Sequence, residues 1–460
     1  MNETPFAPGT CDKTRNFRFL DKGLADFAAA EGLLLPPGLL ARYREICRTV
    51  LLRDPTETEL RFLDRVFCLF RQMPAGVRVA AIMGADDETA HIWGDICQKA
   101  REIGAKAPPT AEELMSLCGK ALVRAGIPAQ GESPRIGTAA GIAVACGGVA
   151  PRLSLTVGNC AAALLPAQSP SVPAAKMLYL LTAADEDRFA EEISAFLGAH
   201  RSMGILPLAL TGGEGILPHL ATGAGLDVDF SLLPGFDPAN PSEVLFTAGK
   251  RAFLFFAPQN AVPVLASEAN PRLVLFGSLT GTRMLTLRAG PQPFCTLPAD
   301  FFPLLATSAP MALTPKVPQA APGEVHLTEN DRFLLAGVCT GSEVPYSVAR
   351  CLAALAAHGA ELSAVRMGAV LELPPNDARA AATAEALPLL FGYHRTAAEL
   401  VLPTTEQLAV EDERIAHPRL TVFLCAERKA GAPVPLPEGA VDGVRTGDFG
   451  GLRRVLSEKM

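Results

Sequence analysis

The stretch Leu210-Thr211-Gly212-Gly213-Glu214-Gly215-Ile216-Leu217-Pro218-His219-Leu220 decides the fold that the sequence predicts. The apolar run 204–210 before the glycines is typical of a buried strand, and the spacing of Ile216, Leu217 and Leu220 after them is typical of a helix. Glycines at such a corner let the backbone turn tightly and bring its N–H groups close to a ligand. The start of the helix also offers unpaired donors and a positive dipole end to a phosphate.

This corner has two interpretations. In the first, four residues bind the phosphate of a nucleotide cofactor: Thr211, Gly212, Gly213 and Gly215. In the second, the corner is a tight turn without a ligand, because short glycine motifs are common. Glu214 places a negative charge where the phosphate would sit, which favours the second interpretation.

Composition limits the classes of partner. A chain of 460 residues is long enough for two or three domains. The formal net charge of −7 provides no basic surface, so we expect neither nucleic acid nor an anionic membrane as a partner. The 11 cysteines include no Cys-x-x-Cys pair, which is typical of reduced, buried thiols and gives no zinc motif.

No targeting or membrane segment is predicted. The N-terminal residues 1–17 are polar and lack the apolar core of a signal peptide. The apolar stretch 137–151 is shorter than the ~20 residues that a membrane-spanning helix needs. We therefore expect a soluble, cytoplasmic protein.

The N-terminal part, 18–73, shows helical periodicity. Asp54-Pro55-Thr56-Glu57 is typical of a helix start, since proline fits the first turn and acidic residues favour the positive end of the dipole. The helix that follows carries Leu60, Leu63, Phe67 and Phe70 on one face.

The segment Arg53-Asp54-Pro55-Thr56-Glu57-Thr58-Glu59-Leu60-Arg61-Phe62-Leu63-Asp64 resembles the linker of phosphoribosylformylglycinamidine synthase, the glutamine-dependent ligase of purine biosynthesis. In that family an acidic residue and an active-site histidine follow shortly afterwards. Here Leu69 and Phe70 stand at those positions. A phenyl ring can neither transfer a proton nor bind a phosphate, so the resemblance implies a helix without its catalytic residue.

The segment 136–170 is predicted to form short strands, at 142–146 and 153–157, of a small sheet. The resemblance implies that an ATP- and substrate-binding half-domain lies near here, with metal-binding aspartates. Between Arg135 and Lys176, however, the sequence contains no Asp, Glu or His. A Mg²⁺–nucleotide site needs carboxylates, which this segment does not supply.

Residues 175–290 form the clearest predicted domain, with strands at 177–181, 204–210, 226–230, 252–256, 273–276 and 284–287 and helices at 185–200 and 260–266. Their order resembles the C-terminal domain of aminoimidazole ribonucleotide synthase and its relatives. The acidic residues nearest to the glycine corner in sequence are Glu214, Asp227, Asp229 and Glu243, and we expect that they do not converge on one point.

The remainder is predicted as a linker and a further half-domain. Residues 291–322 contain eight prolines, which indicates an interdomain linker. Strands are expected at 333–338, 364–373 and 420–426, and helices at 344–358 and 377–390.

Three small groups of residues in this chain have two interpretations each. Thr340 or Ser342 is either a helix cap or part of a phosphate pocket, and the pair His394 and Arg395 either meets a ligand or lies on the surface near a helix end. The acidic turn 86–88 is either a solvated helix start or a Mg²⁺ site.

The predicted fold class is α/β (α+β): a helical linker domain followed by aminoimidazole ribonucleotide synthase-like half-domains with mixed sheets. The predicted segments are 1–125 (helical), 126–174 (strand-rich), 175–290 (α/β domain), 291–322 (linker) and 323–460 (second half-domain).

Two functions are consistent with the sequence. The first is a shortened, diverged relative of the synthase, a pseudoenzyme without catalytic residues or a metal site, which binds a nucleotide or ribotide or acts as a scaffold, with homodimers implied by the superfamily. The second is an active ligase that uses ATP and Mg²⁺ to activate an amide or carboxylate oxygen.

Overall fold

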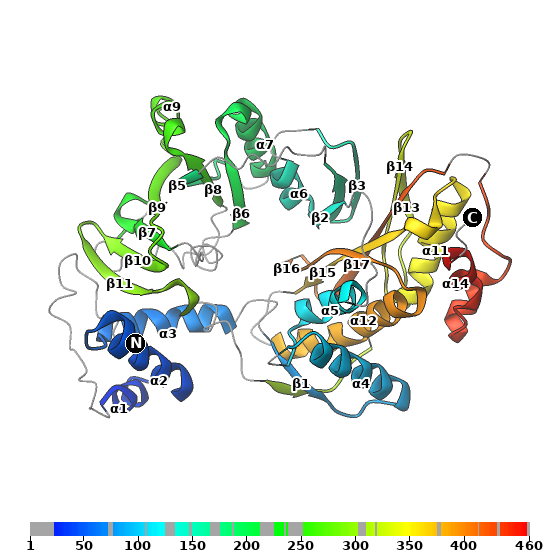
Figure 1. Cartoon of the computed structure of the whole chain (residues 1–460), viewed down its shortest axis with the longest axis horizontal. Coiled ribbons are helices and arrows are strands. Elements are labelled where there is room, and N and C mark those ends of the chain that lie inside the picture. Colours follow the sequence, from blue (N-terminus) through cyan, green and yellow to red (C-terminus); the bar gives the residue numbers. More distant parts are fainter. Residues whose placement is uncertain are drawn as a thin grey trace. The chain divides into compact units, whose positions relative to one another are not determined.

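A computed structural model gives the structure of the chain (Figure 1). It describes residues 23–71, 77–105, 108–124, 134–146, 150–165, 175–185, 188–211, 225–233, 236–237, 252–301, 310–317, 320–374, 379–412, 414–429 and 433–457. Within these ranges, no helix is both long enough and apolar enough to cross a bilayer.

The chain divides into two compact units. Unit 1 comprises Met1–Arg71, Ala143–Gly148 and Ser169–Thr307, and unit 2 comprises Gln72–Ile142, Val149–Gln168 and Ser308–Met460. The five segments predicted from the sequence follow one another along the chain, and as domains they remain a prediction.

The N-terminal part of unit 1 is helical, as predicted. Helix α1 spans Gly23–Ala30, α2 spans Pro37–Ile46 and continues as the π-helical turn η2 (Cys47–Leu51), and α3 spans Glu57–Arg71. The apolar face of α3 buries Leu60, Leu63 and Phe67, because residues three and four apart lie on one side of a helix.

The rest of unit 1 is a seven-stranded sheet with the order β11-β10-β7-β9-β5-β8-β6. Its strands are β5 (Ala175–Thr182), β6 (Leu206–Thr211), β7 (Leu226–Asp229), β8 (Ala252–Pro258), β9 (Leu273–Leu279), β10 (Met284–Ala289) and β11 (Gln292–Pro298). Only β7 and β10 pair in parallel, so the sheet is mixed. Short 3₁₀ turns are η4 (Arg201–Met203), η6 (Phe230–Leu232), η8 (Gln259–Ala261) and η9 (Ala299–Phe301).

Helices α7 (Phe189–Ala199) and α9 (Val262–Ser267) cover one face of this sheet. Phe189 and Ile193 of α7 pack with Phe253 and Phe255 of β8 in the same buried cluster. Because successive residues of a strand point to opposite faces, Phe253 and Phe255 face the helices together.

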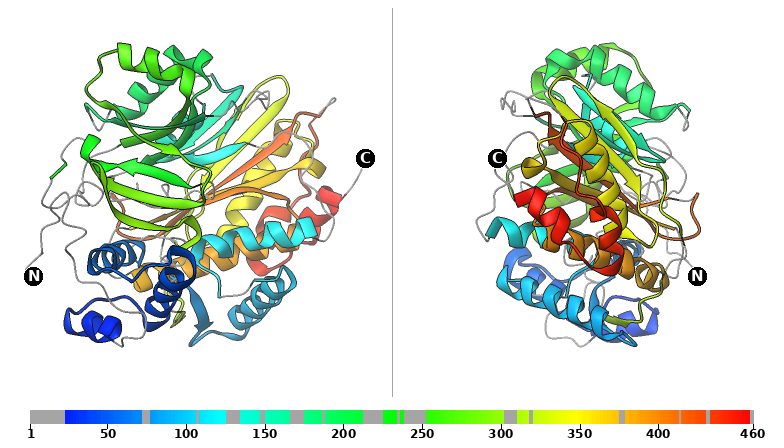
Figure 2. Two further views of the ribbon diagram at one scale, coloured as in Figure 1. Left: turned by 60° about the vertical axis from the view of Figure 1, so that its left-hand side comes forward. Right: turned by 90° about the vertical axis from the view of Figure 1, so that its right-hand side faces the viewer.

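Unit 2 is built on a five-stranded sheet with the order β13-β14-β17-β15-β16. The strands are β13 (His326–Glu329), β14 (Phe333–Cys339), β15 (Arg366–Leu373), β16 (Thr404–Glu411) and β17 (Arg419–Glu427). Strands β15 and β16 run parallel and the other pairs are antiparallel. In Figure 2 these yellow and orange strands run side by side.

Helices cover one face of this sheet. They are α4 (Asp87–Glu102), α5 (Ala111–Arg124), α11 (Val344–Ala357), α12 (Arg379–Leu400), α13 (Ala440–Gly443) and α14 (Gly450–Ser457), with the 3₁₀ turns η10 (Leu362–Ala364) and η11 (Val444–Thr446). A two-stranded parallel sheet of β1 (Val79–Ile82) and β12 (Met311–Leu313) adds to the same core.

The other face carries a three-stranded sheet with the order β2-β4-β3, formed by β2 (Arg135–Thr138), β3 (Leu153–Val157) and β4 (Cys160–Leu164). The alternation along β14 explains both layers: Leu334 and Ala336 belong to the core on the helix side, and Phe333 and Leu335 to the core beneath the small sheet. The predicted α/β class with mixed sheets is therefore confirmed.

Two element predictions were wrong. Residues 142–146, predicted as a strand, belong to helix α6 (Ala139–Cys146), which begins where the Thr138 hydroxyl accepts a hydrogen bond from the Gly141 N–H at 3.0 Å. The proline-rich stretch is not a linker at 292–298, because β11 occupies it. An edge strand tolerates proline, since half of its N–H groups need no partner strand. Gly277 lies inside β9, where the close packing favours glycine, since a Cβ would sit 2.8 Å from the Asp227 carbonyl oxygen.

Candidate functional site

The family-like segment 53–64 places a buried carboxylate at the start of α3. Thr56 precedes the first helical residue, and its hydroxyl oxygen accepts a hydrogen bond from the Glu59 N–H at 3.3 Å. The sequence Thr-x-x-Glu is that of a capping box, of which the bond to the Thr56 hydroxyl is present, and this bond supports the helix start here. Glu59 itself is only 2% exposed.

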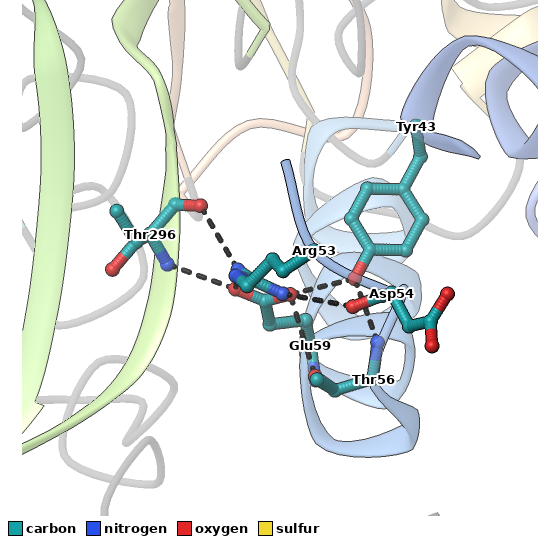
Figure 3. Close-up of polar contacts among 6 residues, drawn as sticks. All are labelled: Tyr43, Arg53, Asp54, Thr56, Glu59 and Thr296. Atoms are coloured by element: carbon teal, nitrogen blue, oxygen red, sulfur yellow. Dashed lines mark hydrogen bonds and ion pairs between the residues drawn. The ribbon is translucent and has the colours of Figure 1, made fainter. Parts of the chain in front are cut away.

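The Glu59 carboxylate accepts hydrogen bonds from three parts of unit 1 (Figure 3). Arg53 Nη2 donates to Oε1 at 2.5 Å, and Tyr43 Oη donates to Oε2 at 2.6 Å. The backbone N–H of Thr296, in β11, donates to Oε1 at 2.9 Å. The carboxylate therefore joins α2, the α3 start and the edge of the seven-stranded sheet.

The remaining polar atoms of this cluster are also bonded within it. Arg53 donates to the carbonyl oxygens of Asp54, at 3.2 Å, and Thr296, at 3.4 Å. The Tyr43 hydroxyl oxygen accepts from the Thr56 N–H at 3.2 Å. The arrangement holds the helices to the sheet, and its charged groups point at one another.

The pKa shifts of the neighbouring groups are those expected around an ion pair between Arg53 and Glu59. Burial lowers the pKa of the Arg53 guanidinium, but the hydrogen bond and the negative charge of Glu59 outweigh burial, so the net pKa is raised. Burial, followed by the charge of Glu59, raises the pKa of Tyr43 well above its usual value and that of Cys47 to about 12. Arg53 is thus held charged, and Tyr43 and Cys47 neutral.

Of the four residues predicted to bind a phosphate, the structure describes only Thr211. Thr211 is the last residue of β6, while Gly212, Gly213, Glu214 and Gly215 lie outside the described residues. Phosphate binding there stays a prediction.

Two of the acidic residues near that corner in sequence are described. Asp227 forms a bidentate ion pair with Arg288 of β10. Asp229 accepts from the Ser231 N–H and hydroxyl and from the Gly290 N–H. Asp227 therefore binds a neighbouring strand, and Asp229 binds the turns next to its own strand. Glu243 lies outside the described residues.

The interpretation of Thr340 or Ser342 as the cap of α11 was wrong, and phosphate binding at this turn stays a prediction. Glu343 is the N-cap and makes no side-chain cap bond. The Ser342 N–H donates to the Ala320 carbonyl oxygen at 2.9 Å, and the Thr340 hydroxyl to the Gly341 carbonyl oxygen at 3.1 Å. The neighbouring backbone thus takes the Ser342 N–H that a phosphate would need.

The interpretation of His394 and Arg395 as a surface pair near a helix end was wrong for the histidine. His394 lies within the 22-residue α12, is 3% exposed, and its Nε2 is 3.2 Å from Lys99 Nζ. Burial, and then the charge of Lys99, lower its pKa to about 3, so the ring is neutral. Arg395 pairs with Glu88 and stacks on Phe449.

The acidic turn 86–88 is a helix start. The Asp86 side chain caps α4 by accepting from the Thr89 N–H at 2.8 Å. Among the residues that the structure describes, no group of three or more His, Cys, Asp or Glu side chains is arranged to hold a metal ion.

Sequence reasoning missed a second buried acidic site, in unit 2. Glu372 of β15 and Asp412, directly after β16, are 4% and 7% exposed. The sequence did contain a signal for Glu372, because it is the only acidic residue in the strand 366–373 and directly follows the apolar run 367–371. Nothing local in the sequence marks Asp412 as its partner.

Comparison with known proteins gives structural similarity only. No family model and no curated protein matches the chain. Among solved structures, PurL of Thermotoga maritima complexed with ATP is 14% identical, with 90% of this chain and 88% of that chain covered and a TM-score of 0.44. The complex of the same protein with AMPPCP is 14% identical, with 84% and 82% covered and a TM-score of 0.45. Phosphoribosylformylglycinamidine synthase II from the same organism is 14% identical, with 84% and 83% covered and a TM-score of 0.43. These structures belong to the family that residues 53–64 resemble.

Proposed function

We propose that this chain is a phosphoribosylformylglycinamidine synthase-like protein that has kept the scaffold and lost the ligase reaction. In this proposal it acts by binding a nucleotide or ribotide, or as a scaffold that pairs into homodimers in the cytoplasm. The observation that carries the proposal is that two charged residues of the family-like segment, the buried Glu59 and the half-buried Arg53, bind each other and the edge of the sheet.

The retained residues are those that build structure. The capping arrangement of Thr56 and Glu59 and the buried face of α3 support a helix that packs as a linker. The chemistry that the resemblance implies is missing about three turns later, where Leu69 and Phe70 replace an acidic residue and a histidine. Neither side chain can exchange a proton near neutral pH.

The segment 136–175 supports the same conclusion. Transfer of a phosphoryl group from ATP needs a divalent cation to neutralise the developing charge, and carboxylates to hold that cation. This segment contains no acidic residue and no histidine. A nucleotide bound without turnover requires less of the protein, namely donors for the phosphates and a site for the base.

The test uses the purified full chain. We expect no phosphate release from ATP in the presence of Mg²⁺, formylglycinamide ribonucleotide and either ammonia or glutamine. Nor do we expect Mg²⁺ to increase any thermal stabilisation by ATP, because a ligand stabilises only the state to which it binds. Ribotide-dependent phosphate release would overturn the proposal and establish the alternative, an active ATP-dependent ligase.

Two further measurements separate binding from scaffolding. Isothermal titration with ATP, and with the ribotide, detects a surviving pocket whether or not turnover occurs. Light scattering coupled to size exclusion gives the molar mass and so detects a homodimer. A monomer that binds neither probe would contradict the proposed role altogether.

A further inference from the structure

The C-terminal ends of helices α7 and α9 meet in unit 1 through one histidine and one glutamate. His200 is the C-cap of α7, and Glu268 is the C-cap of α9. Nε2 of His200 contacts Oε1 of Glu268, and the two side chains are 9% and 29% exposed. Because both helices pack on the same core of the seven-stranded sheet, this contact fastens the end of one helix to the end of the other.

The second ring nitrogen of His200 also faces an acceptor. Nδ1 lies 2.6 Å from the Phe196 carbonyl oxygen, one turn earlier in α7. A carbonyl oxygen and a carboxylate oxygen accept hydrogen bonds and have no proton to donate, so each ring nitrogen needs a proton of its own. The proton between Nε2 and Glu268 stays on the ring, because an imidazole is a stronger base than a carboxylate. A ring with both protons is the positively charged imidazolium.

The position of His200 favours a positive charge. The last carbonyl groups of a helix form the negative end of its dipole, which stabilises a cation at the helix C-terminus. The Phe196 ring lies against the imidazole, with 4.3 Å between the ring centroids, and the electrons of an aromatic ring attract a cation. Together with the Glu268 carboxylate, these groups surround His200 with partners for a charged ring.

We propose that His200 is an imidazolium that fastens the C-terminal end of α7 to the end of α9, and that this end of α7 opens when the ring loses a proton. A ring with one proton turns a nitrogen lone pair toward an oxygen lone pair, so one of its two contacts becomes repulsive. The attachment is therefore complete at low pH and is lost as the pH rises. Near the start of α7, Glu192 pairs with Arg272 at 2.8 Å. No imidazole takes part in that pair, so the start of α7 stays attached.

The elements packed against His200 carry few other groups that could titrate in its place. Two exposed or half-exposed ion pairs involve the remaining charged side chains of α7, and they are Glu191 with Arg188 and Glu192 with Arg272. Tyr179 of β5 lies in the same core, and burial raises its pKa, so it stays neutral. Lys176 of β5 is exposed and, by the alternation along a strand, points away from this core. Among the side chains that the structure describes, His200 forms its ion pair with Glu268 alone.

His358 in unit 2 provides an internal comparison, because it caps α11 in the same way. Its Nδ1 lies 2.8 Å from the Ala354 carbonyl oxygen, again one turn earlier in the helix. Within the described part of the chain, the histidine rings with an acidic partner are those of His200 and His417. The ends of α7 and α11 therefore share the helix dipole and the carbonyl contact, and they differ in the carboxylate.

The experiment compares the full chain with the variant Glu268→Gln. The amide of this variant can accept from a protonated ring or donate to an unprotonated one, so its attachment does not need the charge. Hydrogen exchange of the amides of residues 196–203 is measured for both proteins from about pH 5 to about pH 9, which includes the range in which imidazoles titrate. Comparison at equal pH cancels the intrinsic pH dependence of exchange.

We expect exchange of these amides in the unmodified chain to accelerate relative to Glu268→Gln by about three- to tenfold as the pH rises. A ratio that is independent of pH, or that falls, would overturn the proposal. The amides at the end of α11, next to His358, should show no such change. Glu191→Gln is the matched control variant, because Glu191 also lies on α7 and its side chain is 74% exposed. Its exchange should equal that of the unmodified chain at every pH.

A second measurement covers the case in which Glu268→Gln does not fold. In the NMR spectrum of the unmodified chain at about pH 6, both ring N–H protons of His200 should give signals, because hydrogen bonds in a buried site slow their exchange with water. The exposed His358 should give no signal from its Nε2 proton. Absence of either ring proton of His200 would overturn the proposal.

Discussion

Arg53 and Glu59 form an ion pair of 2.5 Å in which the acid is buried and the base half-buried. The same Glu59 oxygen accepts from Thr296, more than two hundred residues further along the chain. This hydrogen bond between residues far apart in sequence connects the helical N-terminal part of unit 1 to β11.

Glu59→Ala should therefore destabilise the chain strongly. The substitution leaves the Arg53 guanidinium and the Tyr43 hydroxyl without their acceptor, and breaking a buried pair costs about 3–5 kcal/mol, with the lower end expected because Arg53 is 36% exposed. Urea unfolding followed by circular dichroism measures the change. The control is Glu45→Ala, which removes the partner of the exposed Arg48 and should have no measurable effect. Equal changes in the free energy of unfolding for the two variants would show that the buried pair stabilises the chain no more than the exposed pair does.

Gly368→Ala should also destabilise the chain. A Cβ at this position of β15 would lie 2.5 Å from Thr405 Oγ1 and 2.9 Å from the Glu406 carbonyl oxygen, and it would collide with Ile136. Because backbone cannot move aside cheaply, we expect a loss of about 3 kcal/mol in the free energy of unfolding. Gly94→Ala, in α4 with no atom within 4 Å of its Cβ, should instead raise it by about 0.5–1 kcal/mol. A neutral Gly368→Ala variant would contradict the packing described for β15.

His394 should not titrate near neutral pH. Its pKa of about 3, caused by burial and then by Lys99, keeps the ring neutral between about pH 5 and pH 8. A base whose pKa is lowered by folding binds fewer protons in the folded state, so its contribution to stability is lost as the pH falls from about 6.5 toward 3. Two-dimensional NMR of the imidazole nuclei as a function of pH measures the pKa of His394. The signal of this residue is the one that is missing in the variant His394→Gln. A midpoint near the ordinary value would be incompatible with the buried position.

Asp412 should contribute to the acid sensitivity of unit 2. The folded chain holds its pKa at about 2, against 3.8 ordinarily, so its contribution is present above about pH 4 and is lost as the pH falls toward 2. We expect a contribution on the order of 1 kcal/mol, because the partner Arg414 is 67% exposed and water screens it. The free energy of unfolding of Asp412→Asn should depend less on pH in this range. If the free energy of unfolding of that variant fell with pH as steeply as that of the unmodified chain, the Asp412 carboxylate would be excluded as the cause of the acid sensitivity.

The elements that sequence reasoning found are those whose pattern is strong over their whole length. The buried strands β8 and β14 are continuous apolar runs, β17 is apolar over residues 422–426, and α3 has an apolar face with helical spacing. Helix α6 was mistaken for a strand because a short apolar run has no decisive period. Strand β16 was missed because Thr404–Glu411 mixes polar and apolar residues, and its place is decided by parallel pairing with β15.

The candidate sites were less predictable than the fold. Arg53 and Glu59 stood out in the sequence as part of a family-like segment, but their partner Thr296 is distant in the chain. Glu372 and Asp412 are 40 positions apart and meet only because β15 and β16 are neighbours. Pairing of that kind depends on the tertiary structure and leaves no local pattern.

The interleaving of the two units along the chain has a consequence for synthesis on the ribosome. All segments of unit 1 have been made once residue 307 is complete, whereas the segment 72–142 of unit 2 must wait for residues 308–460. Strand β1 obtains its partner β12 only then. Since nascent chains fold from the N-terminus as they emerge, the apolar surfaces of α4 and α5 stay without their core through most of translation. Chaperone demand should accordingly concentrate on this early-made, late-folding segment.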